Sequence, residues 1–209
     1  MPLTLSPAVA ADIPALTDIY MLAFQDPVTI ACFPRTPSIR RWWDSHNAEA
    51  FMGNPAARFI KVKDGDRIIA YAKWNVPLCP DEPPAASRSS SSSSDPNLLP
   101  LWPDDADKAL CDRFFGELVN KRKEVMGERP HYYLEMLATL PEHRDRGAAS
   151  LLIRWGLEGA DRDGLEAYVE ASLAESAFYE QFGWRTSGSV VILEGQYTEL
   201  CMLRPPQPV

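Results

Sequence analysis

Residues 132–155 read YYLEMLATLPEHRDRGAASLLIRW, and this stretch decides the fold. Its apolar first half predicts a strand over 131–140 that ends at Pro141. After a charged turn, the helical spacing of Leu151, Leu152 and Trp155 predicts an amphipathic helix that begins at Gly147. A buried strand followed by a short turn and a helix indicates an α/β fold.

The start of this helix has the chemistry of an anion site. The N–H groups of a first helical turn have no partner within the helix, and they lie at the positive end of its dipole. Arg144 and Arg146 add positive charge on either side of Asp145. The next side chains are too small to block a pyrophosphate, and they are Gly147, Ala148, Ala149 and Ser150. We therefore expect the peptide nitrogens of residues 145–150 to converge on a diphosphate.

The rest of the chain alternates helical and strand patterns. Apolar spacing and turn signals predict helices at 12–24, 38–51 and 104–125, a β-hairpin within 58–76, a strand at 165–171, a short helix at 173–182, and strands at 185–193 and 196–203. Between them, residues 80–103 are rich in Pro and Ser. Such a composition buries too little apolar surface to offset the entropy of ordering, so it predicts a mobile insertion rather than a domain boundary.

The composition excludes several classes of protein. The 209 residues fit one domain with a substantial core, and 45% hydrophobic with 24% charged residues is typical of a folded soluble protein. A net charge of −8 opposes nucleic-acid binding, which depends on clustered Lys and Arg. The cysteines form no C-x-x-C pair, so no metal site is expected. No apolar stretch reaches the roughly 18 residues of a membrane span, and no signal-peptide pattern is present, so we expect a cytoplasmic protein without a membrane partner.

Two motifs resemble those of a known family. A strand, then Arg144-x-x-Gly147-x-Ala149, then a helix resembles the pyrophosphate-binding motif of the GNAT superfamily of N-acetyltransferases. Residues 164–184, GLEAYVEASLAESAFYEQFGW, resemble the second signature of that family, with its aromatic pair and its closing Gly and aromatic residue. Ser172 stands where the family often has Asn. The resemblance covers residues 132–184, and the order of helices and hairpin before them agrees with it.

This resemblance implies a fold and a cosubstrate. The fold would be an α/β domain over residues 1–209 with a mixed, mostly antiparallel central sheet, splayed fourth and fifth strands, and flanking helices. The cosubstrate would be acetyl-CoA, without a metal. Its pantetheine and thioester carbonyl would meet the backbone of Leu137, Ala138 and Thr139, and its diphosphate would meet residues 144–150, with Ser172 nearby.

The resemblance also suggests catalytic groups. Tyr179 stands where many members place the phenol that protonates the departing CoA sulfur, although a core role for its ring is the alternative. Glu135 is the favoured base for the amine proton and Glu170 the alternate, and a solvated carboxylate is equally compatible with either. Strand alternation puts Glu135 on the face of Leu137 unless a bulge resets the parity. The acceptor pocket would be lined by aromatic side chains, namely Phe33, Trp42, Trp43 and Trp74.

The expected function is therefore direct transfer of an acetyl group from acetyl-CoA to a primary amine of a small molecule. Two alternatives remain at this level. One is a regulatory module that binds coenzyme A without turnover, because a fold does not establish catalysis. The other is transfer to a protein amine, such as a basic tail attracted by the acidic surface. The sequence leaves the acceptor, the acyl-chain preference and the oligomeric state open.

Overall fold

The computed structural model describes residues 2–78, 98–192, 195 and 197–208, and one sheet organises them. Seven strands follow the order β1-β2-β3-β4-β5-β7-β6. All neighbours are antiparallel except β4 and β5, which are parallel. The strands are β1 (Leu3–Pro7), β2 (Ala57–Asp64), β3 (Arg67–Asn75), β4 (His131–Thr139), β5 (Glu166–Ser172), β6 (Arg185–Ile192) and β7 (Tyr197–Arg204). The mixed, mostly antiparallel sheet is as the sequence predicts.

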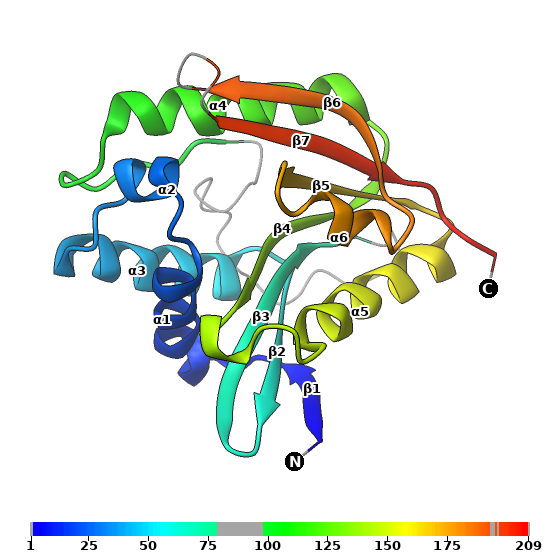
Figure 1. Ribbon diagram of the computed structural model, residues 1–209, viewed down its shortest axis with the longest axis horizontal. Coiled ribbons are helices and arrows are strands. Elements are labelled where there is room, and N and C mark those ends of the chain that lie inside the picture. The colour runs from blue at the N-terminus through cyan, green and yellow to red at the C-terminus, as the bar shows by residue number, and fades with distance from the viewer. Residues whose placement is uncertain (1, 79–97, 193–194, 196, 209) are drawn as a thin grey trace.

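β4 and β5 separate partway along their length. Their pairing runs from His131 opposite Glu166 to Leu134 opposite Val169 and then stops. Beyond Leu134, β4 continues to Thr139 with β3 as its only partner strand among the described residues. Figure 1 shows β1–β4 diverging from β5, β7 and β6. The splayed fourth and fifth strands are thus confirmed.

A β-bulge accompanies this separation. Lys73 of β3 pairs with Met136, whereas the next residue, Trp74, pairs with Leu134. Glu135 is therefore the extra residue on β4, and the alternation of side chains is reset there. The sequence alone left this parity open.

Helices cover both faces of the sheet. They are α1 (Ile13–Ala23), α2 (Pro27–Cys32), α3 (Pro37–Gly53), α4 (Lys108–Met126), α5 (Ala148–Asp163) and α6 (Ser176–Glu180), with 3₁₀ turns η1 (Ala10–Asp12) and η3 (Pro141–His143). Leu134 packs in the apolar cluster that contains Leu152 of α5, whereas Tyr133 packs in the cluster that contains Phe114 of α4. Because adjacent strand residues face opposite sides, α4 and α5 lie on opposite faces. None of these helices, within the described residues, is long and apolar enough to cross a membrane.

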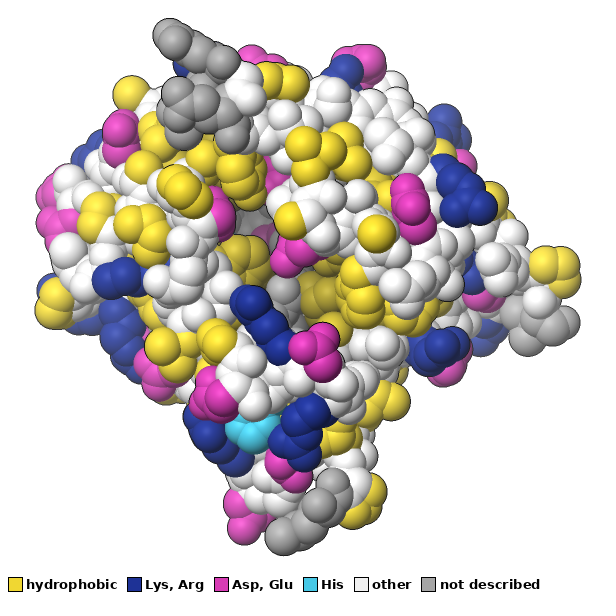
Figure 2. Space-filling model, in the orientation of Figure 1, with side chains coloured by type: hydrophobic (Ala, Val, Ile, Leu, Met, Phe, Trp, Pro, Cys, Tyr) yellow, Lys and Arg dark blue, Asp and Glu magenta, His cyan; other side chains and the backbone are white. Residues whose placement is uncertain are grey.

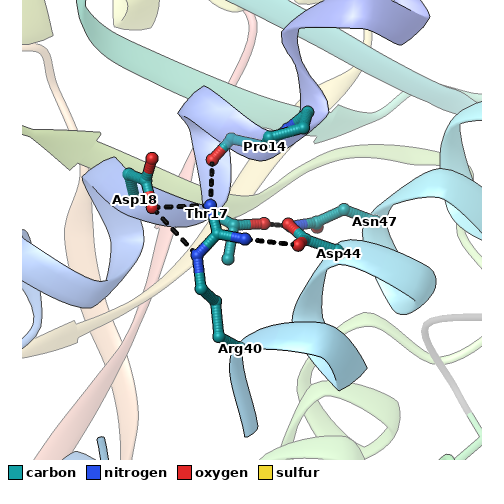
Figure 3. Close-up of polar contacts among 6 residues, drawn as sticks. All are labelled: Pro14, Thr17, Asp18, Arg40, Asp44 and Asn47. Carbon is teal, nitrogen blue, oxygen red and sulfur yellow. Dashed lines mark hydrogen bonds and ion pairs between the residues drawn. The ribbon is translucent and has the colours of Figure 1, made fainter. Parts of the chain in front are cut away.

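The first and third helices are fastened to each other by polar contacts (Figure 3). The guanidinium of Arg40 on α3 donates to Asp18 of α1 at 2.8 Å and to Asp44 one turn further along α3 at 2.7 Å. Beneath this pair, the buried Asn47 amide donates to the Thr17 hydroxyl at 3.4 Å. These contacts fix the orientation of α3, which carries the paired tryptophans.

Some elements differ from the sequence expectation. The strand β1 and the short helix α2 were not predicted. The sequence does carry a start signal for α2, because Asp26 accepts a hydrogen bond from the Thr29 N–H at 2.9 Å and Pro27 occupies the first turn. α4 begins at Lys108 rather than at 104, because Asp107 caps it by accepting from the Leu110 N–H.

The Pro- and Ser-rich stretch falls only partly within the described residues. Residues 79–97 lie outside them. Residues 98–103 approach α3, where the Trp42 indole donates to the Leu101 carbonyl at 2.9 Å. The Trp102 ring lies 5.8 Å from that of Phe33 and 5.2 Å from that of Phe115. This end of the stretch is therefore part of the packed structure.

Candidate active site

The divergence of β4 and β5 opens a cavity of about 1080 Å³. Its wall includes the second half of β4, the turn into α5, the end of β5, the start of β7 and residues of α6. Parts of α1, α2, α3 and α4 complete it. Figure 2 shows the hollow on this face, with hydrophobic side chains inside it. A concave, mostly apolar space with a few polar groups is the usual form of a ligand site.

The N-terminus of α5 forms one end of the cavity. Gly147 caps the helix with φ +84°, and Asp145 also has a positive φ of 60°. Within the described residues, no hydrogen bond uses the backbone N–H of residues 145–150. A side chain added at Gly147 would meet no atom within 4 Å of its Cβ. The turn is neither a strand nor covered by other segments, so its peptide nitrogens are free to bind an anion.

The two arginines of this turn behave differently. Arg144 lines the cavity, and its guanidinium donates to the Ala23 carbonyl at 3.2 Å. The Arg146 guanidinium instead pairs with Asp64 at 2.7 Å, and its side chain is not part of the cavity wall. The hydrogen bond from Arg146 lowers the pKa of Asp64. Of the predicted pair, only Arg144 places its charge at the cavity.

The exposed edge of β4 forms the middle of the cavity. Leu137, Ala138 and Thr139 line the wall and pair with β3 on one side only. Because β5 has diverged, alternate backbone N–H and C=O groups of this segment face the cavity without a strand partner. The edge can therefore bind an extended, amide-containing ligand as an added strand would bind.

Tyr179 of α6 lines the same cavity at the end of β5. Its side chain is buried, and its ring contacts Trp184 edge-on at 5.6 Å. Burial, and then the carboxylates of Glu175 and Glu199, raise the pKa of Tyr179 well above its ordinary value. No hydrogen bond joins its hydroxyl to the part of the chain that the structure describes. The phenol stays neutral, with a proton to donate.

Ser172 ends β5 and also lines the cavity. Its hydroxyl donates to the Glu175 carboxylate at 3.2 Å. In the sheet, Ser172 lies opposite Glu199 of β7. The end of β5 therefore brings a hydroxyl and two carboxylates close to Tyr179.

Glu135 lies in the cavity wall but is tightly held. Its carboxylate accepts from the Lys73 ammonium and from the Asn75 amide, each at 2.6 Å. Burial alone would raise the pKa of Glu135, but the charge and hydrogen bond of Lys73, with that of Asn75, lower it below the ordinary value. Nearby, burial and then Lys73 lower the pKa of His46 to about 4. Glu135 is thus an ionised partner of a buried cation.

Glu170, the alternate base, is also paired. The Arg122 guanidinium lies 3.3 Å from its carboxylate and 4.1 Å above the Tyr133 ring. Burial raises the pKa of Glu170, and the charge of Arg122 only partly opposes it. Both carboxylates expected from the sequence are therefore on the cavity wall, and each faces a cation.

Glu199 of β7 is a site residue that the sequence reasoning missed. Its side chain is only 8% exposed, yet it lines the cavity. The Tyr197 hydroxyl donates to its Oε1 at 2.8 Å, whereas its buried Oε2 has no hydrogen-bond partner among the described residues. Burial, and then the neighbouring acids Glu170, Glu175 and Asp26, raise the pKa of Glu199 to about 8, against the hydrogen bond from Tyr197. The available signal was a lone Glu on the face of β7 that also holds Tyr197, Cys201 and Leu203.

Aromatic rings line the remaining end. Phe33, Trp42 and Trp43 are on the cavity wall as expected. The expectation for Trp74 was wrong, because its ring is fully buried beneath α5 and its indole donates to the Leu152 carbonyl at 3.2 Å. Lys73, the preceding residue on β3, lines the cavity, so strand alternation turns Trp74 to the face that α5 covers. Within the described residues, no group of acidic, His or Cys side chains has the arrangement of a metal site.

Solved structures share this architecture. A protein from Corynebacterium glutamicum, named as histone acetyltransferase HPA2 and related acetyltransferase, matches with a TM-score of 0.66 and 23% identity over 100% of this chain and 99% of that chain. The ribosomal-protein-S18-alanine N-acetyltransferase from Escherichia coli matches with a TM-score of 0.58 and 13% identity over 100% and 96% of the two chains. An acetyltransferase from Thermus thermophilus matches with a TM-score of 0.55 and 16% identity over 98% and 97%. At these identities the likeness shows the fold.

The family is shown by a separate comparison. The family described as acetyltransferase (GNAT) matches residues 13–184. The matched region includes both motifs and all of the cavity wall except the residues of β7. The turn into α5, the splayed strands and the buried phenol occupy the matched region. The chain therefore belongs to the GNAT family of acetyltransferases.

Proposed function

We propose that this protein transfers the acetyl group of acetyl-CoA directly to a primary amine of a small molecule. The observation that carries the proposal is one continuous cavity that joins the peptide nitrogens of residues 145–150 to the edge of β4, both without a backbone partner in the part of the chain that the structure describes. An anion site followed by an open strand edge suits a ligand with a diphosphate and an amide-bearing arm. Strands from both ends of the chain share the sheet, which supports one acetyltransferase domain over residues 1–209.

The residues present fit coenzyme A. The N–H groups of residues 145–150 would hold its diphosphate, with the open space at Gly147 admitting it and Arg144 adding charge. The edge formed by Leu137, Ala138 and Thr139 would bind the pantetheine amides. When bound, acetyl-CoA supplies an acetyl thioester whose carbonyl the same edge can polarise. Ser172 would flank the arm near the thioester.

Tyr179 is the proposed proton donor. Amide formation from a thioester leaves a thiolate, which needs a proton. The buried, neutral phenol lies in the cavity at the end of β5, where a thioester on the β4 edge would meet the amine. Its hydroxyl has no competing partner among the described residues, so it is available to the sulfur.

Glu135 stays a predicted base. Its lowered pKa makes it a weak proton acceptor, and its contacts with Lys73 and Asn75 suit it to holding the Lys73 charge and the bulge in β4. A carboxylate without a cation is better suited to removing a proton from an ammonium group. A different carboxylate on the cavity wall is therefore a better candidate for the base than Glu135 or Glu170.

A small acceptor agrees with the shape of the cavity better than a protein amine does. The end opposite α5 is walled by α2, α3 and α4 and by residues 98–100 and Trp102, so the acceptor side is bounded on several sides. A protein acceptor, such as the one that the Escherichia coli protein is named for, remains the alternative. A CoA-binding module without turnover is the second alternative, and the Tyr179 hydroxyl, which has no hydrogen bond to the described residues, argues against it.

The test is release of CoA thiol from acetyl-CoA in the presence of an amine panel that includes a Lys-rich peptide. Tyr179→Phe should bind acetyl-CoA normally and slow turnover at least several-fold, because it removes only the proton donor. Tyr132→Phe is the matched control, since its hydroxyl bonds Asp163 outside the cavity. Unchanged turnover in Tyr179→Phe would remove that residue from the mechanism. Binding of acetyl-CoA without thiol release by any amine would instead support the non-catalytic module.

A further inference from the structure

The acceptor end of the cavity has an aromatic wall, which we define as Phe33, Trp42, Trp102 and Phe115. These rings come from segments far apart in the chain, and all of them line the cavity. Phe33 stacks on Trp42 with centroids 5.6 Å apart and planes 20° apart, and it lies 5.9 Å from Phe115. Such a surface binds flat apolar groups through dispersion and through removal of apolar area from water.

Acidic side chains also line the cavity. Glu199 presents a buried oxygen without a hydrogen-bond partner among the described residues, and Asp26 and Glu175 line the same cavity. The buried cations nearby, Lys73 and Arg122, each already face a carboxylate. A buried carboxylate oxygen without a donor is costly unless a ligand supplies one. A cationic N–H donor is the ligand group that satisfies it best.

Contacts between side chains link Glu199 to the aromatic wall. The Tyr197 hydroxyl bonds Glu199, and the Tyr197 ring lies 5.9 Å from Phe114, which in turn lies 5.0 Å from Phe115 of the aromatic wall. Glu199 also lies opposite Ser172 at the end of β5 and, after burial and Glu175, helps to raise the pKa of Tyr179. An ammonium on Glu199 would therefore lie beside the proposed transfer point, with room for an apolar group toward the aromatic wall.

We propose, resting on the acetyl transfer proposed above, that the acceptor is a primary amine joined by a short link to an aromatic ring or a similarly flat apolar group. Glu199 binds the ammonium of this acceptor and takes its proton, and the aromatic wall holds the ring. Glu199 is thereby a catalytic residue that also sets specificity.

The proton balance is complete with the groups present. The ammonium gives one proton to the Glu199 carboxylate, and the uncharged nitrogen forms the N–C bond to the acetyl carbonyl carbon while the C–S bond breaks. Tyr179 gives its proton to the sulfur, and the second proton lost by nitrogen restores the phenol. Glu199 then releases its proton to solvent. A pKa of about 8 for Glu199 suits both uptake and release near neutral pH.

The first experiment compares 2-phenylethylamine with n-propylamine in the thiol-release assay. The value of kcat/KM should be at least about tenfold higher for 2-phenylethylamine, because only its ring reaches the aromatic wall. Phe115→Leu should reduce this preference several-fold. Phe51→Leu is the control, because Phe51 is a half-buried ring on α3 that contacts Phe59 and lies outside the cavity wall.

The second experiment tests Glu199 in two ways. Glu199→Gln should lower kcat by about tenfold or more and flatten its rise with pH, because the amide cannot take a proton. It should also weaken binding of 2-phenylethylamine to the CoA-bound protein by about tenfold or more in calorimetry. Glu180→Gln, an exposed change on α6, is the control for charge. Circular dichroism and urea unfolding are used to check that each variant is folded.

The outcomes separate this proposal from the function on which it rests. Equal or faster reaction of n-propylamine, spermidine or a Lys-rich peptide would overturn the acceptor class and leave acetyl transfer standing. Wild-type kinetics and binding in Glu199→Gln would overturn the role of that residue. If no amine releases thiol, acetyl transfer fails, and the calorimetric binding of 2-phenylethylamine with its loss in Glu199→Gln still decides whether the site recognises such amines.

Discussion

Replacing Gly147 with Glu is the sharpest test of the site at the start of α5. Gly147 has φ +84°, and the space around its missing side chain is open to 4 Å. A Cβ at this position therefore has open space, and the main cost to folding is the left-handed backbone. That cost is about 1–2 kcal/mol for a residue other than Gly. The variant should fold, so any loss of binding reports on the ligand.

The loss of affinity follows from charge. A carboxylate about 4 Å from one phosphate charge is repelled by roughly 1 kcal/mol in water and roughly 4 kcal/mol at the effective dielectric of a protein surface. At about 1.4 kcal/mol per factor of ten, acetyl-CoA should bind roughly 5- to 700-fold more weakly. The added bulk acts in the same direction because it occupies the space through which backbone N–H groups approach the diphosphate. We expect the upper part of this range.

The assay is calorimetric titration of acetyl-CoA into each folded variant. Gly164→Glu is a matched control, because Gly164 ends the same helix with φ +68° and equally open space. It introduces the same charge and the same kind of backbone strain at the far end of α5. Undiminished affinity in Gly147→Glu, or an equal loss in Gly164→Glu, would refute the placement of the diphosphate.

Three further predictions concern stability. Gly156→Ala should lower the free energy of unfolding by about 1–3 kcal/mol in urea, because its Cβ would lie 2.2 Å from the Trp74 ring. Lys73→Met should cost roughly 3 kcal/mol in the same assay, because it leaves Glu135 ionised and without its cation. Between the ordinary glutamate pKa of 4.5 and the raised pKa of about 8, folded Glu199 keeps its proton whereas the unfolded chain has lost it. Stability should therefore fall with rising pH, by up to about 1.4 kcal/mol per unit, as followed by thermal unfolding.

Each of these predictions has a control in the same chain. Gly116→Ala lies inside α4 with its nearest contact at an ordinary 3.8 Å, so it should leave stability unchanged or raise it slightly. Arg67→Met breaks an exposed pair with Glu142 and should cost less than about 1 kcal/mol. Glu199→Gln should lose its share of the pH slope. Stability that is independent of pH in the wild type, or a cost for Gly116→Ala equal to that for Gly156→Ala, would contradict the reasoning.

The sequence by itself determined the features that depend on neighbouring residues. The strand over 131–139, the turn that follows and the helix from Ala148 are local, because apolar spacing, a glycine with positive φ and small side chains act over a few positions. The proposed anion site at residues 145–150 is local for the same reason. Two local motifs resemble those of the family to which the chain belongs, and the fold brings Tyr179 and Ser172 of the second motif to the cavity wall.

Only the tertiary structure decided which distant groups meet. The bulge at Glu135, its pairing with Lys73, the Arg146 contact with Asp64 and the burial of Trp74 depend on strand register, which no short stretch of sequence specifies. The buried Glu199 Oε2, which has no hydrogen-bond partner among the described residues, is a product of the fold, because β7 pairs with β5 and buries this side chain. Burial and neighbouring charge set the protonation of a carboxylate, and both are properties of the folded surroundings rather than of the residue type.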